Sequence, residues 1–171
     1  MTRRLTVLMG ALALAACGQG DSAPAQGDAA APPAAPSPAS APAPAPTDAE
    51  AVAVLASLPA PYNAADLQNG ERVFARCRSC HTINEGGPNR VGPNLWQVFG
   101  RTAGTHGTYN YSPALREAGF TWDAAKLDEW LNNPREFLPG NKMSFAGVRD
   151  ADDRRDLIAW LKVNTGYAPE A

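Results

Sequence analysis

Two cysteines followed directly by a histidine form the most reactive segment of the chain, Cys77-Arg78-Ser79-Cys80-His81. This Cys-x-x-Cys-His spacing is the attachment pattern of a c-type haem. Each thiol can add across one haem vinyl group as a thioether, and the adjacent imidazole can bind the iron. The segment therefore predicts one haem c, attached covalently through Cys77 and Cys80, with His81 as proximal ligand.

A dithiol redox pair and half of a zinc site are the other chemistries that this spacing serves. A thioredoxin-like pair is expected within a βαβ unit, and a zinc site needs two further Cys or His ligands. Outside the run the chain offers only Cys17 and His106 as such ligands. The haem site is therefore the favoured interpretation.

The elements that position this site lie in the second part of the 171-residue chain. Every Trp, Tyr and Phe stands at or after Tyr62, and these side chains dominate the burial energetics of a core. We therefore expect one folded domain over residues 62–171. Its basic and acidic residues balance, and the net charge of the chain is -2, which argues against nucleic-acid binding.

The first 16 residues have the pattern of an export signal. Arg3 and Arg4 precede a short apolar stretch from Leu5 to Ala16, which is too short to span a bilayer. Its end, up to Cys17, resembles the bacterial lipoprotein signal, in which the cysteine becomes the lipidated first residue. We expect lipidation of Cys17, the alternative being ordinary cleavage near Ala16. A lipid carrying more than one acyl chain makes a stable anchor.

Residues 17–61 consist largely of Ala, Pro, Ser and Gly. Such a composition buries too little apolar surface to order itself, so we expect a disordered tether. The short apolar patch from Val52 to Leu58 is expected to form a transient helix at most.

In the domain, helical spacing and capping residues predict short helices and no strands. The expected helices are 64–78 after Asn63, 113–118 after Ser112, 123–132, a turn from Pro134, and 151–165 after Asp150. Long loops join them. The fold class is all-α, and a buried haem would supply the apolar area that so small a core lacks.

A series of sequence blocks carries a family resemblance. In order they are Gly70-Glu71-Arg72-Val73-Phe74, the haem run, Gly92-Pro93-Asn94-Leu95, Phe99-Gly100-Arg101, Gly119-Phe120-Thr121-Trp122, Asn133-Pro134, the stretch from Pro139 to Gly147, and Asp156-Leu157-Ile158-Ala159-Trp160-Leu161. The chain resembles class I cytochromes c of the mitochondrial and alphaproteobacterial type. The resemblance implies four to five short helices and long loops around one covalent haem.

The resemblance also implies His81 and Met143 as the axial ligands. Met143 is the only methionine beyond the signal. His106, in a glycine-rich loop, is the rival sixth ligand. A methionine sulfur favours ferrous iron relative to a second imidazole, and two protein ligands leave no position for oxygen or peroxide.

Supporting residues follow from the resemblance position by position. The carbonyl of Pro93 would accept the second ring N–H of His81. Arg101, Tyr111 and Trp122 would hydrogen-bond or neutralise a haem propionate.

The chain departs from the family pattern at several positions. Trp130 replaces a Tyr near the methionine sulfur and Asn141 replaces a Thr of the ligand loop, and both still offer a donor. Leu115 replaces an Asn beside the haem. The basic partner face is reduced to a sparse set, which predicts weak electrostatic steering: Arg76, Arg78, Arg135 and Lys142, with Glu136 among them.

By this resemblance the protein would be a monomeric, membrane-tethered one-electron carrier rather than an enzyme. It would shuttle electrons from a bc-type quinol-oxidising complex to a terminal oxidase or reaction centre, docking near Cys80 and Lys142. Export and lipidation would place it on the periplasmic side of a bacterial membrane, the inner one by function. The alternatives are a haem enzyme or gas- or peroxide-binding protein whose Met143 is displaced, and a lipoprotein with a structural haem.

Overall fold

The computed structural model describes residues 45–168, so the predicted signal, Cys17 and most of the tether lie outside the described residues. The chain forms α1 (Asp48–Ser57), the 3-10 turn η1 (Tyr62–Ala64), α2 (Leu67–Phe74), α3 (Pro113–Arg116), α4 (Ala124–Asn132), α5 (Pro134–Phe137) and α6 (Ala151–Asn164). Within this range one isolated bridge, between Thr102 and Thr121, is the only β pairing. The all-α prediction is confirmed.

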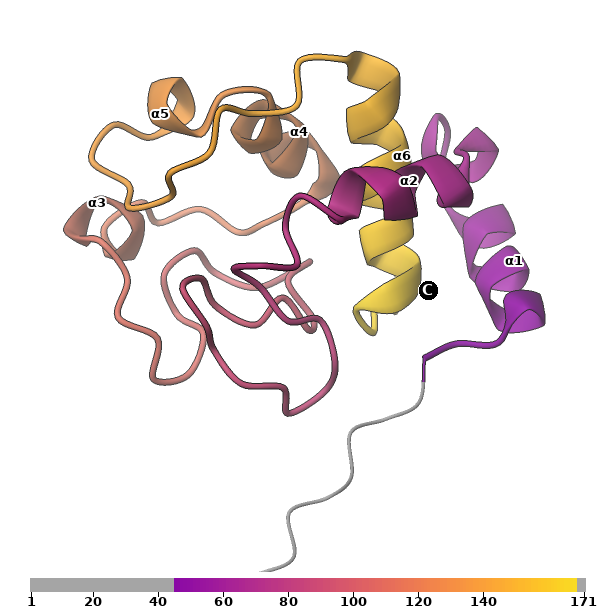
Figure 1. The fold of residues 1–171 in the computed structure, drawn as a ribbon, viewed down its shortest axis with the longest axis horizontal. Helices are drawn as coiled ribbons and strands as arrows, with labels where there is room; N and C mark the ends of the chain where they lie inside the picture. Colours follow the sequence, from indigo (N-terminus) through magenta and orange to yellow (C-terminus); the bar gives the residue numbers. More distant parts are fainter. Residues whose placement is uncertain (1–44, 169–171) are drawn as a thin grey trace, which may run out of the picture. The chain divides into compact units, whose positions relative to one another are not determined.

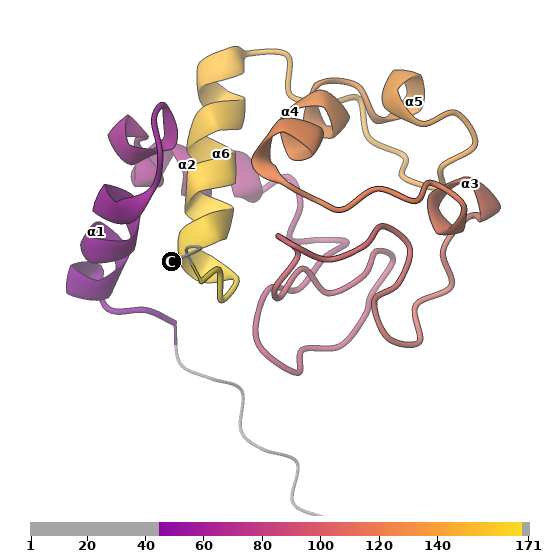
Figure 2. The ribbon, with the colours of Figure 1, turned by 180° about the vertical axis from the view of Figure 1, so that it is seen from behind.

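Helix α2 crosses α6, and the crossing lies between α1 and α4 (Figure 1). A Cβ added at Gly70 would collide with the carbonyl of Asp156 and lie 2.6 Å from the Cβ of Trp160. Glycine therefore lets the two backbones touch. One turn further on, Phe74 stacks on Trp160 with ring centroids 4.5 Å apart. The sides of α6 face α1 and α4 (Figure 2).

Side-chain caps explain where the later helices begin. The carboxylate of Asp150 accepts from the Asp153 N–H at 2.9 Å and begins α6. Asp123 accepts from the Lys126 N–H at 2.7 Å and begins α4. These starts agree with the prediction, because a short acceptor side chain before an apolar run satisfies N–H groups that the helix leaves free.

The first predicted helix of the domain is shorter than expected. Asp66, not Asn63, caps α2, since its carboxylate accepts from the N–H groups of Gln68 and Asn69. The predicted start instead forms η1, and the extended backbone of Ala65 separates the two. The helix ends at Phe74, and the chain continues in turns.

Order begins earlier than the predicted domain boundary at Tyr62. Thr47 and Glu50 form a reciprocal capping box at the start of α1. Leu58 is 3% exposed and packs with Ala65 and Ala159. The predicted disordered tether is therefore wrong for residues 47–58, because Leu58 finds an apolar partner surface on α6 that composition alone does not reveal.

Residues 75–112 form loops without helix and face α3, α4 and α5 (Figure 1). Leu157 and Ile158 of α6 are fully buried and belong to the main hydrophobic core. Across residues 45–168, no helix is both long and apolar enough to cross a bilayer.

Candidate functional site

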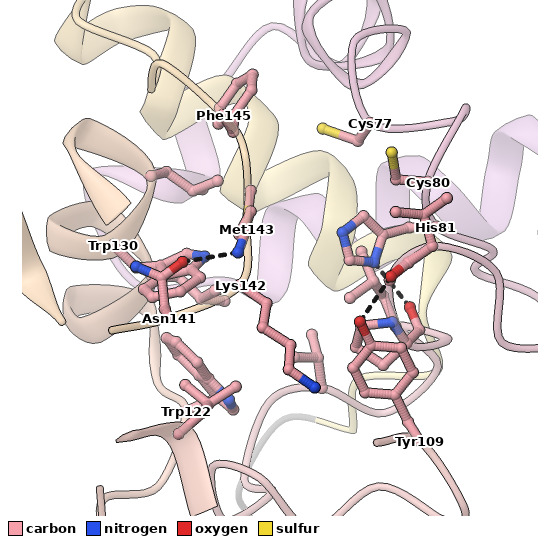
Figure 3. Close-up of a pocket in the computed structure, with 18 of the residues that line it drawn as sticks. Cys77, Cys80, His81, Tyr109, Trp122, Trp130, Asn141, Lys142, Met143 and Phe145 are labelled. Atoms are coloured by element: carbon pink, nitrogen blue, oxygen red, sulfur yellow. Dashed lines mark hydrogen bonds between the residues drawn. The ribbon is translucent and has the colours of Figure 1, made fainter. Parts of the chain in front are cut away.

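The segment after α2 presents two thiols and an imidazole to one cavity. The Cys77 N–H donates to the Phe74 carbonyl at 2.8 Å, and the Cys77 carbonyl accepts from the N–H groups of Cys80 at 3.0 Å and His81 at 2.9 Å. These bonds hold the run in tight turns. Figure 3 shows both thiols beside the imidazole, whose ring points towards the side on which Met143 lies.

The protonation state of His81 is set by its neighbours. Its Nδ1 lies 2.7 Å from the Pro93 carbonyl, which can only accept, so Nδ1 carries the proton and Nε2 keeps a lone pair. Burial lowers the pKa of His81 and outweighs the hydrogen bond to Pro93, which raises it. The ring is therefore neutral at pH 7. A Cβ at Gly92 would lie 2.7 Å from both ring nitrogens. The site thus holds an imidazole suited to bind iron.

The number of ligands near the thiols argues against a zinc site. Cys77 and Cys80 are both free, and burial raises the pKa of the Cys77 thiol to about 11. A structural zinc site takes four protein ligands, of which this segment offers two thiols and one imidazole. Residues 45–168 contain no group of three His, Cys, Asp or Glu side chains placed to hold a metal ion.

A cavity of about 320 Å³ lies between the thiol segment and the loop that carries Met143. Its walls include side chains from α2, α4, α6 and the long loops. All of the predicted cofactor-binding residues line it: Cys77, Cys80, His81, Pro93, Arg101, Tyr111, Trp122, Trp130, Asn141 and Met143. Leu115 lines it too, so an apolar side chain stands there.

The guanidinium of Arg101 is held at the cavity wall by three acceptors. It donates to the carbonyls of Trp96 at 3.1 Å and Asn94 at 3.2 Å, and to Nδ1 of His106 at 2.7 Å. Burial lowers the pKa of Arg101, so a nearby carboxylate would offset the cost of burying its charge. The imidazole of His106 lies outside the cavity lining and is bonded to Arg101 instead.

Aromatic side chains form the floor of the cavity. Trp122 and Trp130 are each 8% exposed and meet edge to face with ring centroids 5.5 Å apart. Tyr111 is 6% exposed. These residues give the cavity the apolar, closely packed walls that a flat macrocycle needs.

Asn141 differs from its expected role. Its two amide hydrogens are bonded to the carbonyls of Pro134 at 2.7 Å and Leu138 at 2.8 Å. Both donors are therefore used within the loop, and neither is left for a cofactor.

Sequence reasoning did not assign a role to Asn94 or Tyr109. Asn94 is 2% exposed, and its amide donates to the Thr82 hydroxyl at 2.7 Å and the Asn84 carbonyl at 2.9 Å. It thereby fixes the loop that brings Pro93 to His81. The Tyr109 hydroxyl donates to the Val91 carbonyl at 2.6 Å at the edge of the cavity. Asn94 belongs to the block Gly92-Pro93-Asn94-Leu95, and its place in that block was the one sequence feature that could have indicated its role.

Comparison with known proteins agrees with this geometry. The family model described as cytochrome c matches residues 67–164. A cytochrome c of Chlamydomonas reinhardtii is 47% identical over 103 residues, which cover 60% of this chain and 92% of that protein. Cytochrome c2 of Blastochloris viridis is 44% identical over 109 residues, which cover 64% of this chain and 86% of that protein.

Among solved structures, cytochrome cH from Methylobacterium extorquens aligns with a TM-score of 0.54 at 43% identity. The alignment covers 57% of this chain and 97% of that one. The chain therefore belongs to the cytochrome c family, as a class I c-type cytochrome, and Cys77 and Cys80 are in position to hold its one covalently attached haem c.

Proposed function

We propose that this electron-transfer protein carries single electrons between membrane redox complexes, with His81 and Met143 as the two axial ligands. Bound haem supplies a one-electron iron couple. His81 holds its proton on Nδ1 and presents Nε2, and Met143 offers a thioether sulfur. With both His81 and Met143 bound to the iron, no coordination position would be left for oxygen or peroxide.

The observation that carries this proposal is the placement of His81 and Met143 in the lining of one cavity beside the two thiols. Met143 also packs against the hydrophobic core, but its place across the cavity from His81 (Figure 3) is the one that a second iron ligand requires. An enzyme or gas sensor needs one open axial position, so the presence of a second candidate ligand favours electron transfer.

An optical spectrum of the ferric holoprotein tests the ligand set. We expect the weak far-red sulfur-to-iron band, and its loss in Met143→Ala. Carbon monoxide should bind the ferrous form, and cyanide the ferric form, of the parent protein slowly or weakly. Both should bind the corresponding forms of Met143→Ala readily. Rapid saturation of the parent by either ligand at neutral pH would favour the enzyme or sensor instead.

The partner surface surrounds the rim of the cavity near Cys80 and Lys142. Val91, at this rim, is 76% exposed. The guanidinium of Arg78 lies 2.8 Å from Glu71 and that of Arg76 lies 4.0 Å from Asp153, so both charges are partly compensated. We therefore propose that docking is largely apolar, with little electrostatic steering.

Salt dependence tests this docking mode. The rate at which oxidase-containing membranes oxidise the reduced protein should change by less than about tenfold between 0.05 and 0.2 M salt, the range over which long-range attraction between exposed charges is screened. A steeper fall in that rate would contradict apolar docking.

We also propose that Cys17 is lipidated and that the segment before α1 tethers the domain to the periplasmic face of the inner membrane. A tether raises the local concentration at membrane partners, so weak docking suffices. The acceptor would be a terminal oxidase or reaction centre, and the donor a bc-type complex.

The anchor is tested in the full chain with Cys17→Ser. The parent should sediment with inner-membrane vesicles and yield an acylated N-terminal peptide in mass spectrometry. Release of the parent by salt washing alone, with no acyl mass, would refute the anchor.

A further inference from the structure

The segment that carries Met143 has few backbone hydrogen bonds. Of residues 142–147, all of which the structure describes, only Met143 has its backbone N–H bonded within the protein. That N–H donates to the side-chain oxygen of Asn141 at 2.8 Å. The position of the Met143 backbone therefore depends on the side chain two residues before it.

The amide nitrogen of the Asn141 side chain is also held by hydrogen bonds. It donates to the carbonyls of Pro134 at 2.7 Å and Leu138 at 2.8 Å, while the Asn141 N–H donates to the Leu138 carbonyl at 3.2 Å. Pro134 is buried at the start of α5. The carboxamide thus connects a packed helix to the Met143 backbone, with all its polar groups bonded.

We infer that Asn141 is a positioning residue that holds Met143 against the cavity and slows the departure of its sulfur from the axial position. The inference rests on the proposed ligand role of Met143. It replaces the donor role towards the cofactor that the sequence suggested, because the donors of this amide are already used.

The other anchors of the segment lie at different points. Lys142 Nζ donates to the Asn110 carbonyl at 2.9 Å on the exposed surface. The Val148 N–H donates to the Leu131 carbonyl at 2.7 Å at the far end. Removing the Asn141 carboxamide therefore leaves both ends attached and loosens the part between them, which predicts local opening rather than global unfolding.

Imidazole capture by the ferric holoprotein measures this opening. Added imidazole takes the axial position only after the Met143 sulfur leaves it; one iron–sulfur bond breaks, one iron–nitrogen bond forms, and no electron is transferred. At saturating imidazole the rate equals the rate of sulfur departure. Asn141→Leu removes all three side-chain bonds, and Asn141→Asp keeps the acceptor and removes both donors.

We expect capture to be about tenfold faster or more in Asn141→Leu and intermediate in Asn141→Asp, since each lost hydrogen bond removes a modest net stabilisation. Amide hydrogen exchange gives a second readout. The Met143 N–H should exchange faster in Asn141→Leu and stay protected in Asn141→Asp.

Asn133→Leu is the matched control. Its amide donates to Glu136 at 2.8 Å beside α5 and makes no hydrogen bond to residues 142–147. It should capture imidazole at the parent rate. Urea unfolding of each variant separates local opening from loss of global stability.

The outcomes separate this inference from the proposed function. A parent protein without the far-red band would refute the ligand assignment itself. A parent with the band, and an Asn141→Leu variant that captures imidazole at the parent rate, would overturn only the positioning role. Two further outcomes would overturn the positioning role as well. One is faster imidazole capture in Asn141→Leu that its loss of unfolding free energy accounts for in full. The other is equally faster capture in Asn133→Leu.

Discussion

Gly70→Ala tests whether close backbone contact between α2 and α6 holds the domain together. In an exposed helix interior this change stabilises by about 1 kcal/mol, because alanine restricts the unfolded chain. At Gly70 the new Cβ would collide with the Asp156 carbonyl and lie 2.6 Å from the Trp160 Cβ. Neither atom can rotate away, so the two helices must separate.

The magnitude follows from these opposing effects. Overpacking a tight contact costs about 1–3 kcal/mol, and rigid neighbours place this site at the upper end. Subtracting the helix-propensity gain of about 1 kcal/mol leaves a net loss of about 2 kcal/mol in the free energy of unfolding. The separation should also disturb the stacking of Phe74 on Trp160.

Urea unfolding of the holoprotein, followed by far-ultraviolet circular dichroism, measures this loss. Gln68 is exposed on the same helix, so Gln68→Ala and Gln68→Gly give the propensity difference without the contact. Gln68→Ala should be the more stable of this pair by about 1 kcal/mol. If Gly70→Ala is as stable as the parent while the control pair behaves normally, the packing argument is refuted.

Two further predictions concern pH. Burial raises the pKa of Asp156, but hydrogen bonds from Asn69 and Arg155, together with a backbone N–H, outweigh it and hold that pKa below its ordinary value. The stability that Asp156 contributes is therefore full above about pH 4 and is lost as the pH falls further. Asp156→Asn should lower the free energy of unfolding by about 1–3 kcal/mol at pH 7. In that variant the urea midpoint should also fall less steeply as the pH drops below about 4. Burial and the charge of Arg101 lower the pKa of His106, so its contribution to stability should fall as the pH drops below about 6.5. His106→Gln should reduce the slope of the urea midpoints in this range, and an unchanged slope would contradict the assignment.

The haem-attachment run and the starts of α4 and α6 could be predicted because their chemistry is local. Two thiols and an imidazole within five consecutive positions define a covalent site whatever surrounds them. Asp150 and Asp123 cap α6 and α4 through N–H groups three residues ahead. In contrast, α1 was missed because its stability depends on Leu58 meeting Ala159, about a hundred positions later in the chain.

The amino-acid sequence by itself determined the cofactor and the family, and it pointed to ten of the residues that line the cavity, since these depend on residue type and order. Only the tertiary structure decided how those residues use their hydrogen bonds. It directs the Nδ1 proton of His81 to Pro93 and both donors of Asn141 to backbone carbonyls. The physical reason is that a donor is used by whichever acceptor the folded backbone brings within about 3 Å, and sequence order does not specify that distance.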